Sequence, residues 1–147
     1  MAGDDTLSGG SGRDTLAGGA GDDLYVVQNS TTLVIEGANA GIDTVKVTMD
    51  YVLPENVENL VMYGQGSRSG YTGLGNALNN LMLGDANNQT LNGLGGNDVL
   101  AGNGGSDTFV FGRGGGHDVI TDFTTGPGTG ADVVRLQDFG LTRFDQV

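Results

Sequence analysis

The sequence predicts an all-β fold, a solenoid in which a short repeat forms successive coils. Three observations lead to this prediction. The chain has a nine-residue period, and each repeat has an apolar residue at one fixed position. Glycine accounts for 29 of the 147 residues, roughly a fifth, where about 7% is usual. The repeat is clearest in residues 9–17 and 18–26, which follow each other without a break.

The period defines eight units in two blocks. The units are residues 1–8, 9–17, 18–26, 75–83, 84–92, 93–101, 102–110 and, after a slip of two residues, 113–121. Their sixth position carries an acid or an amide: Asp5, Asp14, Asp23, Asn80, Gln89, Asp98, Asp107 and Asp118. Their eighth position is always apolar: Leu7, Leu16, Tyr25, Met82, Leu91, Leu100, Phe109 and Ile120.

The last three residues of each unit are expected to form a short strand. Side chains alternate along a strand, so the eighth residue faces inward and its two neighbours face outward. In residues 93–101, Leu100 is predicted inside, with Val99 and Ala101 outside. One large buried side chain per nine residues makes a thin core, because each ordered residue costs conformational entropy.

The net charge of the chain limits the classes of partner that it is expected to bind. The formal net charge is −12, from 18 acidic and 6 basic residues, and 15 of the acids are aspartate. This balance argues against nucleic acid and anionic membranes as partners and favours cations. The chain has no cysteine, so disulfides and thiolate metal sites are excluded. No apolar run approaches the roughly 20 residues of a membrane helix, so no membrane insertion is expected.

Glycine and aspartate at this spacing suit calcium. Glycine allows positive φ angles, which turn carbonyl oxygens into one small space, and the sixth residue adds a carboxylate. Calcium takes six to eight oxygen ligands at about 2.3–2.6 Å, more than a single loop can supply. In a single unit an Asx turn would explain the aspartate equally well. Eight units in register favour ligands, except at Asn80 and Gln89, where a turn or amide-ladder role is the stronger alternative.

The units resemble the G-G-x-G-x-D-x-U-x nonapeptides of the RTX (repeats-in-toxin) family, in which U is a large apolar residue. Residues 9–17 and 18–26 match this pattern at every defined position, and the nonapeptides cover about half of the chain. The resemblance implies a right-handed parallel β-roll or β-helix with Ca²⁺ in its glycine-rich turns. It also implies that two units make one coil, so that alternate loops stack on the same edge.

On that basis, pairs of stacked loops are expected to hold the ions. The pairs are Asp5 with Asp23 and Asp98 with Asp118, and two weaker pairs that each include an amide, Gln89 with Asp107 and Asn80 with Asp98. Asp14 is expected to serve in the same way, and Asp4 and Asp22 add negative potential. The glycines expected to present carbonyl oxygens are Gly3, Gly10, Gly12, Gly19, Gly21, Gly93, Gly96, Gly102 and Gly105.

Four segments follow from this pattern: a first repeat block at 1–26, an insert at 27–74, a second block at 75–121 and capping strands at 122–147. Within the insert, residues 32–36, 44–53 and 57–63 read as strands, which either continue the solenoid, the preferred interpretation, or form a small sheet beside it. Residues 51–60 resemble a Y-x-L-x-x-x-V-E-N-L segment found in inserts of RTX proteins.

The last segment is expected to cover the end of the solenoid. Residues 118–123 and 131–136 read as two strands joined by a loop, and Phe109, Phe111, Phe123 and Phe139 as core of the cap. It resembles the segment that follows RTX blocks and leads to an uncleaved C-terminal export signal. The chain reads as an excised fragment that begins within a repeat and lacks the signal itself.

The residues of a catalytic centre are missing from the sequence. His117 is the single histidine and stands in a turn, and neither H-E-x-x-H nor a P-loop pattern occurs. The expected function is a non-catalytic, extracellular calcium module that folds on export through a type I secretion apparatus. The alternative is an accessory module for an acidic polysaccharide, similar to the R-modules of alginate epimerases, with Arg68, Tyr71 and Arg113 on its surface.

Overall fold

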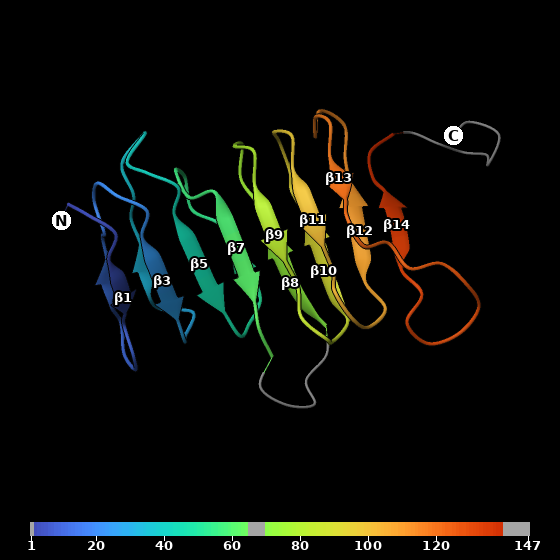
Figure 1. Ribbon diagram of the computed structural model, residues 1–147, viewed down its shortest axis with the longest axis horizontal. Coiled ribbons are helices and arrows are strands. Elements are labelled where there is room, and N and C mark those ends of the chain that lie inside the picture. Colours follow the sequence, from blue (N-terminus) through green and yellow to red (C-terminus); the bar gives the residue numbers. More distant parts are fainter. Residues whose placement is uncertain (1, 65–69, 140–147) are drawn as a thin grey trace.

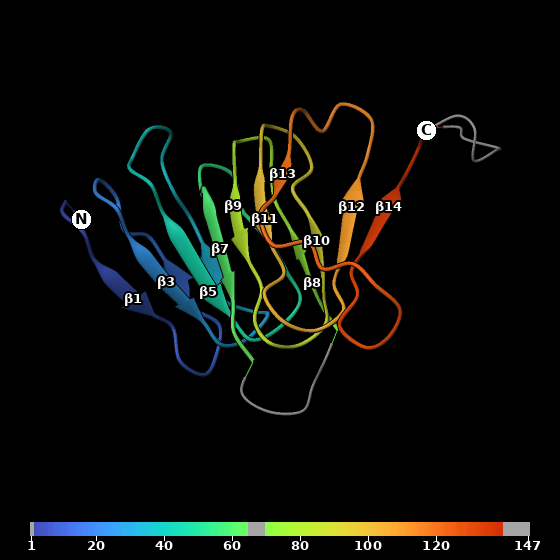
Figure 2. The same cartoon turned by 45° about the vertical axis from the view of Figure 1, so that its right-hand side comes forward.

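The computed structural model describes residues 2–64 and 70–139, and this part of the chain forms a parallel β-solenoid (Figure 1). The predicted all-β fold is confirmed. The termini of the described chain lie at opposite ends of the long axis, as successive coils require (Figures 1 and 2). Arg68 lies outside the described residues. Within them, no helix has the length and apolar character needed to cross a membrane.

Short strands on two walls make up each coil. In the described residues they are β1 (Thr6–Ser8), β2 (Thr15–Leu16), β3 (Leu24–Val27), β4 (Leu33–Val34), β5 (Thr44–Val47), β6 (Tyr51–Val52), β7 (Asn59–Met62), β8 (Tyr71–Leu74), β9 (Leu81–Leu83), β10 (Gln89–Asn92), β11 (Val99–Ala101), β12 (Thr108–Phe111), β13 (Val119–Ile120) and β14 (Val133–Leu136). Turns of glycine, asparagine and aspartate separate them, because these residues adopt the turn conformations that β-branched residues avoid.

Alternate strands pair with one another. One wall is a seven-stranded sheet in the order β1-β3-β5-β7-β9-β11-β13. The other wall consists of a five-stranded sheet, β14-β12-β10-β8-β6, and a two-stranded sheet, β2-β4. Thr6 pairs with Leu24, and Leu81 pairs with Val99, so each residue lies beside the equivalent residue of the next unit but one. Two nonapeptides therefore make one coil.

Residues 27–74 supply strands to both walls. β5 and β7 lie between β3 and β9 in the seven-stranded sheet. The single strand predicted at 44–53 is wrong: β5 and β6 belong to different walls, and residues 48–50 turn the chain between them. The alternation of Val47, Met49 and Tyr51 continues across the turn because all three side chains pack in or against the same core.

The core is a narrow layer of apolar side chains between the walls, to which most repeat strands contribute one buried side chain and β3, β5 and β7 contribute two each. Leu16, Tyr25, Met82, Leu91, Leu100 and Phe109 are buried in it, and Leu7 and Ile120 pack against it. The predicted inward position of the eighth residue of each unit is confirmed. Of the two neighbours of Leu100 predicted outside, Val99 is 37% exposed, whereas Ala101 is 7% exposed without belonging to the core cluster.

The described C-terminal strands extend the two walls. β13 ends the seven-stranded sheet and β14 ends the five-stranded sheet. Phe109 is fully buried and its ring centroid lies 6.1 Å from that of Phe123, but Phe123 remains 39% exposed. All four residues of β14 are exposed, because no described strand follows it. The cap predicted for residues 122–147 includes residues 140–147, which lie outside the described residues, so it stays a prediction.

Candidate metal centre

One acid or amide directly precedes every strand of the seven-stranded wall. These residues are Asp5, Asp23, Asp43, Glu58, Asn80, Asp98 and Asp118. The parallel register places them at the same edge of the sheet, one coil above another. On the other wall, Asp14, Asp107 and Asp132 directly precede β2, β12 and β14, and Gln89 opens β10. The coil therefore builds two columns of carboxylates and amides.

Hydrogen bonds join neighbours within the columns. The Asp5 N–H donates to Asp23 Oδ1 at 2.8 Å, and the Asp98 N–H donates to Asp118 Oδ1 at 3.0 Å. The pairs that contain amides have the same contact: Asn80 N–H to Asp98 Oδ1 at 2.8 Å and Gln89 N–H to Asp107 Oδ1 at 2.7 Å. All four pairs of stacked residues expected from the sequence are thus in direct contact.

The second oxygen of these carboxylates, Oδ2, differs from Oδ1 in its hydrogen bonding. Among the described residues, seven Oδ2 atoms are buried and have no hydrogen-bond partner; they belong to Asp5, Asp14, Asp23, Asp43, Asp85, Asp98 and Asp107. Five of these seven residues are among the six aspartates predicted as ligands, and the sixth, Asp118, is half-buried. A buried oxygen anion without a partner costs free energy, so it needs a cation or a proton. The residues present therefore fit an oxygen-binding metal such as calcium.

Burial perturbs the titration of these groups. It raises the pKa of Asp98 from 3.8 to about 6, although the Asn80 N–H opposes this shift, and the neighbouring Asp118 raises the pKa further. Burial likewise raises the pKa of Asp107 to about 6, against the Gln89 N–H, with help from the charge of Asp132. Without a cation, the folded chain buries negatively charged carboxylates away from water, and this desolvation destabilises their charged form.

Two kinds of glycine make room for this arrangement. At Gly93, the first position of a unit, a Cβ would collide with the Asp98 carboxylate, so only glycine leaves space for that side chain. At Gly96, the fourth position, φ is 113° and a Cβ would collide with the Leu78 carbonyl of the adjacent coil. Of the other glycines predicted at the site, Gly102 faces the Asp107 carboxylate as Gly93 faces Asp98. The remainder have positive φ: Gly3, Gly10, Gly12, Gly19, Gly21 and Gly105.

The two amides use their oxygens within their own loops. Asn80 Oδ1 accepts from the Asn76 N–H at 2.9 Å. Gln89 Oε1 accepts from the Asp85 N–H at 3.3 Å, and its Nε2 donates to Asp85 Oδ1 at 2.6 Å. These contacts favour the turn role that the sequence left open for both residues. Asp85 brings to the Gln89 loop the carboxylate that glutamine lacks.

Five acids in or beside the columns were not predicted as ligands from the sequence: Glu36, Asp43, Glu58, Asp85 and Asp132. A signal was present for two of them. Residues 41–46 and 130–135 both keep the second half of the nonapeptide, G-x-D-x-U-x, although their first halves have diverged. Glu36, Glu58 and Asp85 stand outside that pattern, and only the stacking of the coils brings them to the columns.

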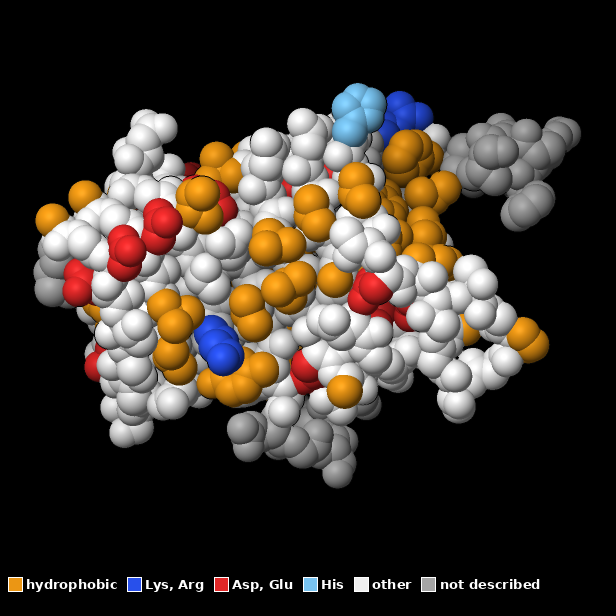
Figure 3. All heavy atoms as spheres, viewed as in Figure 1, with side chains coloured by type: hydrophobic (Ala, Val, Ile, Leu, Met, Phe, Trp, Pro, Cys, Tyr) orange, Lys and Arg blue, Asp and Glu red, His pale blue; other side chains and the backbone are white. Residues whose placement is uncertain are grey.

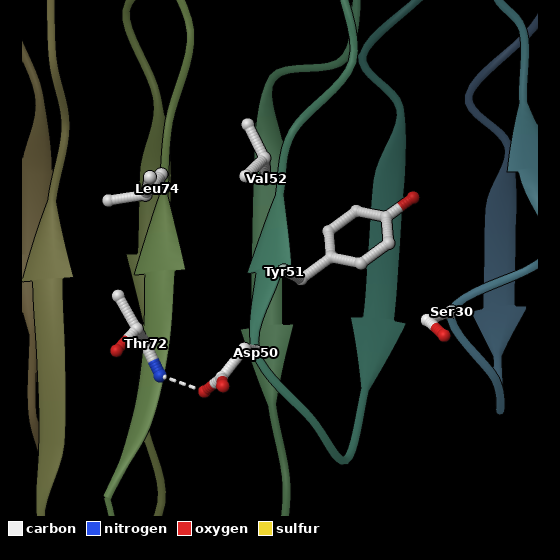
Figure 4. A pocket seen from close by; sticks show the side chains of 6 residues that line it. All are labelled: Ser30, Asp50, Tyr51, Val52, Thr72 and Leu74. Carbon is white, nitrogen blue, oxygen red and sulfur yellow. Dashed lines mark hydrogen bonds between the residues drawn. The ribbon is translucent and has the colours of Figure 1, made fainter.

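A pocket of about 370 Å³ lies where the second wall is interrupted, between the two-stranded and five-stranded sheets. Its lining residues are Ser30, Asp50, Tyr51, Val52, Thr72 and Leu74. Figure 4 shows the Tyr51 ring extending from β6 toward the side where Ser30 lies. Asp50 Oδ1 accepts from the Thr72 N–H at 2.7 Å and thereby joins β6 to β8 (Figure 4).

In the part of the chain that the structure describes, few basic side chains are available at the surface to bind an anion. His117 is exposed, as expected, and Nη2 of the exposed Arg113 donates to the Phe139 carbonyl. Tyr71 is half-buried. Figure 3 shows hydrophobic side chains side by side across one face of the molecule, with acidic side chains grouped at its left and others lying among the hydrophobic ones.

Comparison with known proteins agrees with the geometry. A family model described as the RTX calcium-binding nonapeptide repeat matches residues 1–26 and 83–120 in four copies. Two relatives from Rhizobium meliloti (strain 1021) are endo-1,3-1,4-beta-glycanases. EglC is 51% identical over 126 residues, which are 86% of this chain and 25% of EglC. ExsH is 45% identical over 147 residues, which are 99% of this chain and 30% of ExsH. No solved structure matches the chain significantly.

Proposed function

Because residues 1–26 and 83–120 belong to the RTX calcium-binding nonapeptide repeat family, whose repeats bind Ca²⁺, we propose that this chain is a module that folds when calcium binds. The loop aspartates Asp5, Asp14, Asp23, Asp98, Asp107 and Asp118 are the proposed carboxylate ligands. Carbonyl oxygens of the glycine-rich turns complete the coordination of each ion.

The observation that carries the proposal is the set of buried Oδ2 atoms without partners. Oδ1 of Asp98 is satisfied by the neighbouring coil, while Oδ2 of the same group has neither protein partner nor solvent. Ordinary folded proteins pair such atoms, and an uncompensated buried charge costs several kcal/mol. A divalent cation between coils would neutralise two carboxylates at once.

Coupling between binding and folding follows from this electrostatic balance. At low calcium the stacked carboxylates repel one another, and burial of the narrow core offsets only part of the conformational entropy that folding costs. When calcium binds, its binding free energy adds to the free energy of folding, since the unfolded chain has no preformed site. Weak extracellular calcium modules work at about 10⁻⁴–10⁻³ M calcium.

The relatives favour an accessory role within a larger protein. The chain spans 25% and 30% of the length of two enzymes named as glycanases. We infer a non-catalytic, extracellular module that supports the folding of a secreted partner domain after passage through a type I secretion apparatus. Low calcium inside the cell would keep the module unfolded during export.

Circular dichroism with and without calcium tests the proposal. We expect the β-sheet signal of the chelated protein to be weak and to be restored by millimolar calcium, with magnesium as a control ion of the same charge. Magnesium demands a tight octahedral geometry and keeps its waters, so it should restore little. An identical β signal with chelator and with calcium would contradict the proposal.

A second candidate function is binding of a glycan chain, and the pocket at β6 is the observation that favours it. An aromatic ring, a carboxylate and two hydroxyl side chains surround about 370 Å³ of space (Figure 4). Rings of this kind stack on the apolar faces of sugars, while hydroxyls and carboxylates bind sugar hydroxyls. The relatives named as glycanases agree with this role. The high negative charge of the chain argues for a neutral glycan rather than an acidic one.

Titration with a neutral mixed-linkage β-glucan and with alginate, at fixed calcium, tests this second function. Binding of the β-glucan that Tyr51→Ala abolishes would support it, and Tyr63→Ala is a control outside the pocket. If neither glycan binds, the second function is contradicted and calcium binding remains the proposed function.

A further inference from the structure

Three buried acids meet where the insert joins the first repeat block. One carboxylate oxygen from each of Asp23, Glu36 and Asp43 lies within 4.8 Å of the oxygens of the other two. The side chains are 2%, 8% and 0% exposed, respectively. Glu36 and Asp43 lie outside both segments matched by the repeat family.

Two of these acids have an oxygen with no partner. Asp23 Oδ1 accepts from the Asp5 N–H and Asp43 Oδ1 accepts from the Asp23 N–H at 2.9 Å, but Oδ2 of each is buried and unpaired. The acids are therefore oriented through one oxygen and leave the other for something that the protein itself does not supply. This feature is independent of the clustering of the acids.

Glu36 is held in place as an acceptor. Its Oε1 accepts from the N–H groups of Gly18 and Gly19, both at 3.2 Å, and from the Tyr25 hydroxyl. Its Oε2 accepts from the Gly37 N–H at 3.0 Å. Four donors fix the carboxylate beside the two aspartates, so it is preorganised before any ligand arrives.

The local chain explains how the acids meet. Glu36 and Asp43 flank one loop, 37–42, which carries the chain from β4 back to β5. Asp23 comes from the preceding coil and directly precedes β3. At Gly18 a Cβ would collide with the Asp23 carboxylate and the Tyr25 hydroxyl, so glycine leaves the space in which these side chains lie.

We propose that Asp23, Glu36 and Asp43 form a further calcium site, built by the insert in place of a complete nonapeptide pair. The donors are all carboxylate oxygens, which favour a hard divalent cation such as calcium. The site rests on the proposed function for the choice of ion, and it extends calcium binding across the boundary between the first block and the insert. The insert then folds under the same calcium control as the repeats.

Stoichiometry of a matched pair of variants tests the site. Glu36→Gln keeps the size of the side chain and an oxygen that accepts from Gly18, whereas Glu55→Gln removes the same charge from an exposed position of the insert. At saturating calcium, equilibrium dialysis should show one ion fewer per chain for Glu36→Gln and no change for Glu55→Gln. An unchanged count in Glu36→Gln would overturn the site while the proposed function stands; if the unmodified chain binds no calcium, both fall.

Terbium luminescence gives a second readout if Glu36→Gln fails to fold. Terbium replaces calcium, and tyrosine excites its emission only over a short distance. The Tyr25 hydroxyl contacts Glu36, so Tyr25→Phe should remove most of the tyrosine-excited emission and leave the carboxylates in place. Tyr51→Phe, at the pocket, is the control. Equal emission from Tyr25→Phe and the unmodified chain would place no ion at this cluster.

Discussion

The Asn80 N–H donates a 2.8 Å hydrogen bond to Oδ1 of Asp98 in the next coil, and Oδ2 of the same aspartate remains buried without a partner. The same contact joins Gln89 to Asp107 on the other wall. Each coil thus orients a carboxylate of the next coil and leaves one oxygen for a cation. The stability of the chain should therefore depend on protons, on calcium and on the glycines that make room for these carboxylates.

The stability of the calcium-free chain should fall as the pH rises from about 4 to 6. Asp43, Asp98 and Asp107 have a pKa near 6 when folded, against an ordinary value of 3.8. Between these values the folded state binds more protons than the unfolded state, so the free energy of unfolding decreases with pH. The β-sheet signal in circular dichroism, recorded in chelator at pH 4.5 and at pH 7, measures the change in the folded fraction.

Saturating calcium should reverse that trend, because calcium binds the deprotonated carboxylates and competes with their protons. A calcium-free chain that is more stable at pH 7 than at pH 4.5 would contradict the assignment of these buried groups.

Gly93→Ala should weaken calcium binding and destabilise the calcium-bound chain by about 1–3 kcal/mol, because its Cβ would displace the Asp98 carboxylate. Gly112→Ala is the matched control, since a Cβ at that position would lie in open space. Calcium titration followed by thermal unfolding measures both effects. Equal losses in the two variants would show that Gly93 serves the backbone alone.

Leu94→Gly should stabilise the chain by about 1 kcal/mol. Leu94 has φ of 70°, a left-handed conformation that costs an L-residue roughly 1–2 kcal/mol. Its side chain is 44% exposed, so its removal costs little burial. The midpoint of urea unfolding in calcium measures the gain, and a lower midpoint would mean that Leu94 makes a contact that stabilises the turn.

Leu100→Ala should lower the free energy of unfolding by about 2–5 kcal/mol, because Leu100 is fully buried in the core. Val99→Ala, at the exposed position next to it, should cost much less. Both are measured by urea unfolding at saturating calcium. Similar losses would contradict the inward assignment of the eighth position.

Glu58→Gln should leave the number of bound calcium ions unchanged and lower stability modestly, by about 1–2 kcal/mol. Glu58 Oε2 accepts from the Asp43 N–H at 2.8 Å, so it orients the column without belonging to the three-acid cluster. Dialysis and urea unfolding separate the two effects. Loss of an ion in this variant would make Glu58 a ligand.

The solenoid was predictable because the same residue types recur at the same positions of each nine-residue unit. Tyr25 and Phe109 stand at the same position of different units, and both are fully buried as the period requires. The pairing of Asp5 with Asp23 was predictable for the same reason, once two units were assigned to each coil.

The insert was less predictable because its coils vary in length. Thr44 pairs with Asn59 and Asn59 pairs with Leu81, so the first of these coils is shorter than two nonapeptides and the second is longer. A fixed nine-residue period therefore cannot predict which residues of the insert pair. Glu36 lies beside Asp23 only because their coils stack on each other. The turn at 48–50 could not be predicted for another reason. Val47 and Tyr51 face the same core from opposite walls, so the apolar alternation continues through the turn as it would through one strand.

The most direct test of the calcium account is the anomalous diffraction of crystals grown in calcium. The account predicts an ion with oxygen ligands at about 2.3–2.6 Å, among them Oδ2 of Asp98 and of Asp107. Loops without an anomalous peak, in which these oxygens bind water or a proton, would contradict it.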